Sequence, residues 1–133
     1  MNFFQMLSLR VLLIMLLLHF IADFTLQVPC GLADLKQKKW WERQVPDLGK
    51  SIYRNDWKMG LLCHSLWWSI MICFPLFWWL NEWHLLAIVF LNTHFHAVID
   101  DLKCNKFKIN LVQDQALHFL QILATFLIAG LLK

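Results

Sequence analysis

The sequence has few of the residues that build linkers, disulfide frameworks or nucleic-acid surfaces. Among 133 residues, four are glycine, three are proline and 16% are charged. So little glycine and proline excludes low-complexity linkers, and a formal net charge of +3 gives no reason to expect nucleic acid as a partner. The four cysteines, Cys30, Cys63, Cys73 and Cys104, form no C-x-x-C pair, so neither a disulfide framework nor a thiolate zinc site is indicated.

Apolar side chains, in contrast, are too abundant for a soluble domain of this size. Hydrophobic residues make up 59% of the chain and aromatic residues 15%, and the mean hydropathy is +0.53. A small domain cannot hide that much apolar surface from water, so the composition predicts the lipid bilayer as its main partner. Four segments reach the roughly 20 mostly apolar residues that a spanning helix needs. They are 7–27, 59–80, 83–102 and 112–132.

The predicted fold class is therefore all-α: a polytopic membrane protein whose residues 1–133 form one antiparallel four-helix transmembrane bundle. The first span is predicted to be retained, because no small-residue cleavage site follows its apolar run. The connection 28–58 is predicted to be an amphipathic loop that contains a surface helix. Its apolar side would comprise Leu32, Leu35, Trp40 and Trp41.

Loop charges predict the orientation of this bundle. Segment 28–58 carries seven Lys or Arg residues and segment 103–108 carries three, whereas the turn at 81–82 carries none. Because cytoplasmic loops are enriched in Lys and Arg, both basic segments are expected in the cytoplasm. We therefore expect a multi-pass protein of the cell inner membrane with both termini outside.

Ionisable residues recur inside the predicted spans at helical spacing. In each of three spans a histidine and an aspartate stand four residues apart, so they share one helix face. The pairs are His19–Asp23, His96–Asp100 and Asp114–His118, and His64 adds a histidine near the start of the second span. Histidine comes first in two pairs and second in the third, where the helix runs the other way. In space, the histidines then form one layer and the carboxylates another, nearer the cytoplasm.

These seven residues are predicted to bind a divalent metal ion. An ionisable side chain in the membrane costs about 2.5–3.5 kcal/mol, so the seven must face one another rather than lipid. Imidazole with carboxylate suits zinc first, with manganese or iron as alternatives. A metal-free polar network, a proton relay and a haem site stay open as other readings, although a carboxylate one turn from the histidine favours an ion over haem.

Further residues are assigned positions around this centre. Gly60 lies one turn before His64 and is predicted to leave an opening for water or substrate. Gln27 and Gln115 are predicted to donate hydrogen bonds to the ligands. His94 and Asp101 lie on other helix faces. His94 is predicted to stay outside the site, and Asp101 is predicted to contact the basic loop, with a role as a substitute base as the alternative.

The combined pattern resembles a known family. The chain carries H-x-x-x-D-F-x-x-Q at 19–27, His64, H-x-x-I-D at 96–100 and D-Q-x-x-H at 114–118. This combination resembles small bacterial and phage inner-membrane proteins of an uncharacterised family, classed as a domain of unknown function. The match covers nearly the whole chain. It implies a compact four-span bundle but brings no established activity.

Three functions follow as hypotheses. The first is a metal-dependent hydrolase for a membrane-associated substrate, such as a lipid head group or lipid-linked intermediate, with Asp100 or Asp23 as the proton acceptor. The second is a small metal or proton transporter or a channel subunit. The third is a non-catalytic scaffold whose buried polar network fixes the bundle. The sequence leaves the oligomeric state open.

Overall fold

The computed structural model describes residues 3–26, 31–45, 47 and 52–133, and these contain helices but no strand. The predicted all-α class is confirmed for this part of the chain. The four long helices are α1 (Phe3–Phe20), α4 (Asp56–Cys73), α5 (Glu82–Cys104) and α6 (Leu111–Leu132). Four stretches are long and apolar enough to cross a membrane, by length and composition. They are Leu9–Leu26, Ile52–Leu76, Glu82–Cys104 and Leu111–Leu132.

Two of the long helices change type at their ends. α1 continues as a π-helix, η1 (Ile21–Leu26). A 3-10 turn, η3 (Ile52–Asn55), precedes α4, and a second one, η4 (Phe74–Leu76), follows it. Pro75 is the second residue of η4, and because proline has no backbone N–H, the α-helical hydrogen bonding ends there. The last residue of the predicted first span, Gln27, lies outside the described residues.

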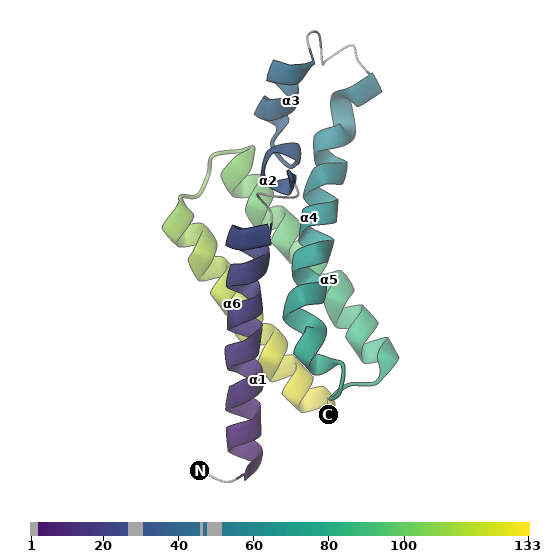
Figure 1. Cartoon of the computed structure of the whole chain (residues 1–133), viewed down its shortest axis with the longest axis vertical. Coiled ribbons are helices and arrows are strands. Elements are labelled where there is room, and N and C mark those ends of the chain that lie inside the picture. The colour runs from purple at the N-terminus through teal and green to yellow at the C-terminus, as the bar shows by residue number, and fades with distance from the viewer. Residues whose placement is uncertain (1–2, 27–30, 46, 48–51) are drawn as a thin grey trace.

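The long helices pack around a common centre. α4 and α6 each contact both α1 and α5, so no long helix stands apart from the other three. In Figure 1 the two chain ends lie at the lower end, while the short helices α2 (Leu32–Leu35) and α3 (Lys38–Gln44) lie at the upper end beside the start of α4. The described part of segment 28–58 is therefore a compact cap on one end of the molecule.

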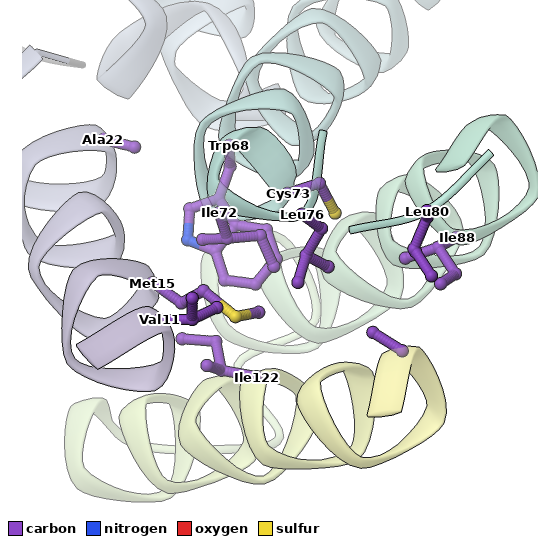
Figure 2. Packing of buried hydrophobic residues seen from close by; sticks show 11 residues of the cluster. Val11, Met15, Ala22, Trp68, Ile72, Cys73, Leu76, Leu80, Ile88 and Ile122 are labelled. Carbon is purple, nitrogen blue, oxygen red and sulfur yellow. The ribbon is translucent and has the colours of Figure 1, made fainter. Parts of the chain in front are cut away.

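An apolar core fills the half of the molecule nearer the chain ends. Figure 2 shows side chains from α1, α4, η4 and α6 meeting there. Met15, Trp68, Ile72, Leu76 and Ile122 have no exposed surface. Along α1, α4 and α6 these residues come on the chain-end side of the predicted ligand histidines. Close-packed apolar side chains therefore lie between the predicted ligand histidines and that end of the molecule.

The cap is attached to the long helices by specific contacts. Trp41 Nε1 donates a hydrogen bond of 2.9 Å to the carbonyl of Leu35, and that carbonyl lies directly against Gly60 of α4. Asn105, just after α5, accepts a 2.8 Å hydrogen bond from the N–H of Lys38. Its amide donates one of 3.2 Å to the carbonyl of Lys36. Two helices, α4 and α5, thus hold the cap in place.

We expect Gly60→Ala to lower the free energy of unfolding by about 1–3 kcal/mol, because a Cβ there would overlap the backbone of Leu35. Gly130→Ala in α6 is the matched control, since its Cβ would meet no atom within 4 Å. Alanine is about 1 kcal/mol better than glycine inside a helix, so the control should be neutral or stabilising. Unfolding in detergent measures both variants, and equal stability would contradict the close α2–α4 approach.

Candidate metal centre

Six of the seven predicted ligands come together from four elements. They are Asp23 of η1, His64 of α4, His96 and Asp100 of α5, and Asp114 and His118 of α6. None of the six is more than 3% exposed. The four-residue spacing directs both members of each pair in α5 and α6 to the same interior face. Asp23 lies in the π-helix, a rare conformation that often occurs at functional sites.

Three nitrogen and oxygen atoms surround His64 Nε2 at short range. His96 Nε2 is 3.1 Å away, Asp100 Oδ2 is 3.2 Å away and Asp23 Oδ1 is 3.4 Å away. His96 Nε2 itself lies 3.7 Å from Asp100 Oδ2. Two imidazole nitrogens and two carboxylate oxygens therefore converge beside α4.

A second convergence surrounds His118 Nε2. Asp100 Oδ1 lies 3.4 Å from it and Asp114 Oδ1 lies 3.5 Å from it. All three atoms are buried, and none has a hydrogen-bond partner among the described residues. An unpartnered buried polar atom is costly, and these three face one another, so they could hold a cation between them.

The atom separations fit metal coordination. Zinc binds histidine nitrogen and carboxylate oxygen at about 2.0–2.2 Å, so two ligands of one tetrahedral ion lie about 3.3–3.6 Å apart. Three groups of residues bring possible ligand atoms within 4.8 Å of one another. These groups are Asp23–His64–His96, His96–Asp100–His118 and Asp23–Asp114–His118. Buried His and Asp groups that can hold a metal ion are thus a feature of this fold.

Hydrogen bonds on the outer side of the cluster orient two of its carboxylates. Gln115 Nε2 donates to Asp23 Oδ2 and to Asp114 Oδ2, at 3.0 Å each. Lys103 Nζ lies 2.6 Å from Asp114 Oδ2. Both carboxylates therefore keep Oδ1 for the interior, and Gln115 donates to two of the predicted ligands, as expected. The other predicted donor, Gln27, lies outside the described residues.

Lys36 is a member of the site that the sequence interpretation missed. It follows α2, is 4% exposed, and its Nζ lies 2.5 Å from Asp100 Oδ2. Burial alone favours the neutral amine, but the charge of Asp100 outweighs this and raises the pKa of Lys36. One signal was available: Leu32, Leu35 and Lys36 share a helix face, so an apolar stripe carried a charge.

An aromatic stack supports the histidines. The Trp68 ring stacks on His96 with centroids 4.2 Å apart, and His96 stacks on His118 at 4.3 Å. Trp68 had no predicted role at the site. The stack fixes the ring planes of two histidines, which is what an organised set of ligands requires.

His19 differs from its predicted role as a ligand. Trp68 Nε1 donates to His19 Nδ1 at 2.8 Å, and His19 Nε2 lies 3.1 Å from Gln115 Oε1, to which it can donate. Both ring nitrogens are thus engaged, and His19 belongs to none of the three possible metal groups. The structure places it beside the cluster, where it supports Gln115.

The prediction that Gly60 leaves an opening through which water or substrate reaches the site is wrong. The backbone of Leu35 packs directly on Gly60 and leaves no room even for a Cβ. A cavity of about 410 Å³ does adjoin Gly60, with Leu32, Trp41 and Cys63 among its lining residues, but its lining includes none of the six clustered residues.

The two residues predicted to lie off the site do so: His94 is exposed, and Asp101 pairs with Lys106 at 2.7 Å.

Comparisons with known proteins assign the chain to no family. No family model, no characterised protein and no solved structure matches this chain. The resemblance of its motifs to an inner-membrane family therefore stays a prediction. At this point the molecule is defined as a helical protein with four candidate membrane spans and a buried His/Asp cluster that can hold metal.

Proposed function

We propose that the chain is a polytopic membrane protein whose four long helices form an antiparallel bundle in the cell inner membrane. Large apolar side chains on every long helix support this, since they face away from the molecule. Leu13, Met59, Phe90 and Leu120 are 56–74% exposed. A soluble bundle would pay for such exposure in water, whereas lipid removes the cost. The basic cap would face the cytoplasm, and both termini would lie outside.

We expect Lys38→Cys to react with a membrane-impermeant thiol reagent only from the cytoplasmic side. The side chain of Lys38 is 53% exposed, so accessibility does not limit the reaction. Glu82→Cys, at the start of α5 and exposed, is the reciprocal control and should react from outside. Both substitutions are made in a chain whose own cysteines are replaced. Labelling of Lys38→Cys from outside would overturn the orientation.

Within this bundle we infer a metal-dependent hydrolase that acts on a membrane-associated substrate. The observation that carries the inference is the convergence of three histidines and three carboxylates, none more than 3% exposed, from four elements. With neutral histidines, the three carboxylates and the ammonium groups of Lys36 and Lys103 leave one uncompensated negative charge. A divalent cation would stabilise that charge distribution. When bound, such an ion lowers the pKa of a coordinated water toward neutrality and polarises the bond to be cleaved.

Residues of the chain would accept the proton and guide the substrate to the site. Asp23 is the better placed of the two predicted proton acceptors, because its Oδ2 accepts from the uncharged amide of Gln115, whereas Asp100 Oδ2 accepts from the ammonium of Lys36. Lys103 is 28% exposed and Gln115 is half-buried, so the substrate would arrive on their side. A lipid head group or lipid-linked intermediate suits a site with an ammonium group at its accessible edge.

The direct test is an assay of the purified full chain in mixed micelles. Phosphate-ester and acyl-ester lipids are offered with zinc or manganese. Released head groups report cleavage of the phosphate esters, and released fatty acids report cleavage of the acyl esters. We expect hydrolysis that a chelator abolishes, that His118→Ala loses and that His94→Ala keeps. Metal-independent turnover, or equal turnover by these two variants, would refute the hydrolase.

A transporter is supported less well by the packing. Polar groups do continue past the histidines, because Gln121 Nε2 donates to Asn92 Oδ1 at 2.8 Å and Thr125 Oγ1 donates to the same atom at 3.0 Å. Beyond them the interior is closed by apolar side chains such as Leu76 and Ala129, which have no exposed surface. A conducting path would need polar lining throughout.

A further inference from the structure

We propose that the cluster binds two divalent cations rather than one, and that the Asp100 carboxylate bridges them. This inference rests on the proposed metal function and deepens it. Its basis is that the two oxygens of Asp100 face different histidines. Oδ2 lies 3.2 Å from His64 Nε2, whereas Oδ1 lies 3.4 Å from His118 Nε2.

The first ion position is defined by the atoms around His64. His64 Nε2, His96 Nε2 and Asp100 Oδ2 lie 3.1, 3.2 and 3.7 Å from one another. Asp23 Oδ1, at 3.4 Å from His64 Nε2, supplies a fourth donor. Two nitrogens and two oxygens complete a tetrahedral set, which is the usual number of ligands for zinc.

The second position is defined by the atoms around His118. Its Nε2 faces Asp100 Oδ1 at 3.4 Å and Asp114 Oδ1 at 3.5 Å. None of these three buried atoms has a hydrogen-bond partner among the described residues. Three protein ligands leave a coordination position for water or substrate, as catalytic metal sites require. The second position is also the one next to Lys103 and Gln115, the accessible side.

One ion cannot use all of these donors. The six residues direct seven donor atoms inward, whereas a tetrahedral ion takes four. The contact between Lys36 and Asp100 Oδ2 does not prevent bridging, because a carboxylate offers about four lone-pair sites on its two oxygens. Lys36 can accordingly hold the bridging carboxylate in place while both oxygens bind metal.

The number of ions decides the class of substrate. A single divalent ion would leave the cluster with a net charge of about +1, whereas two would leave about +3, counting the ion pairs to Lys36 and Lys103. The more positive site favours a phosphate ester, whose oxygens can contact both ions as in other two-metal hydrolytic centres. Within the proposed function, we therefore infer a phosphate-containing head group rather than a carboxylic ester.

The test is to strip the full-length protein in detergent with a chelator, reload it with Mn²⁺ alone, and measure manganese per chain together with the electron paramagnetic resonance spectrum. We expect two ions per chain and the spectrum of a spin-coupled pair. Asp114→Asn should retain one ion with an uncoupled six-line spectrum. The control Asp101→Asn, which alters a carboxylate outside the cluster, should retain two.

The outcomes separate the two proposals. One manganese per wild-type chain with an uncoupled spectrum would overturn the ion pair and leave the metal centre standing. No bound manganese, together with no bound zinc in a parallel reload, would overturn both. Should Asp114→Asn fail to fold, the stoichiometry and spin coupling of the wild type still decide the question.

Discussion

Asp100→Asn is expected to strip the bound metal and to destabilise the bundle more than any other conservative substitution in it. Asp100 is 1% exposed and accepts from Lys36 at 2.5 Å. It also approaches His64 and His118 at 3.2 and 3.4 Å. Removing its charge leaves the buried ammonium of Lys36 unpaired, and breaking a buried ion pair on one side costs about 3–5 kcal/mol. Unfolding in detergent and metal content are the two measurements.

A second variant separates the charge effect from the metal effect. Asp100→Asn combined with Lys36→Met removes both members of the ion pair, so most of the lost stability should return. Metal binding should not return, because the bridging carboxylate is still missing. An Asp100→Asn protein that keeps its full metal content would contradict the role given to this residue.

His96→Ala should have the second largest effect. The ring of His96 has no exposed surface, its Nε2 lies 3.1 Å from that of His64, and the ring lies between Trp68 and His118 in the stack. Its loss removes a ligand and opens a cavity, which together should abolish metal binding and cost about 2–5 kcal/mol. Metal content and thermal unfolding of the purified variant report the two losses.

Three other histidine-to-alanine substitutions serve as controls for His96→Ala. His94→Ala, on the same helix but exposed, should leave metal content and stability unchanged. His84→Ala, which loses an exposed contact with Asn81, should do the same. His19→Ala should lower stability through Trp68 and Gln115 yet keep the metal. Equal metal loss in the His94 and His96 variants would mean that polar side chains in general bind the metal, rather than the buried cluster.

The four-residue spacing of histidine and aspartate in the sequence was enough to predict much of the cluster. The pairs His96–Asp100 and Asp114–His118 lie on regular α-helix, α5 and α6, where a four-residue spacing fixes one face. The reversed order of residues in the second pair placed its aspartate at the same level as Asp100, and both now approach His118. Hydropathy located the long helices because their apolar runs are long and nearly uninterrupted.

The position of His19 beside the cluster, and not among its possible metal ligands, has a local cause. The α-helix ends at Phe20 and the π-helix begins at Ile21. The 3.6-residue period that linked His19 to Asp23 therefore stops between them, and the wider π turn changes their relative direction. Composition gives no signal for such a change of helix type.

The errors at Lys36 and Gly60 share another cause. Both residues depend on how α2 packs against α4, which is a contact between segments and not a property of either one. Loop charge counting treats Lys36 as one of many cytoplasmic cations, although its side chain is buried against Asp100. Likewise, a glycine beside a site can mean close backbone approach as readily as an opening.

X-ray absorption at the metal edge, on full-length protein purified in detergent without added metal, tests the central claim most directly. Imidazole gives a distinct scattering pattern, and metal–nitrogen and metal–oxygen bonds of about 2.0–2.2 Å are resolved from metal–sulfur bonds of about 2.3 Å. The buried cluster predicts a retained first-row metal with histidine nitrogen and carboxylate oxygen around it, and without sulfur. A protein that retains no such metal, or one whose metal is bound by cysteine sulfur, would contradict it.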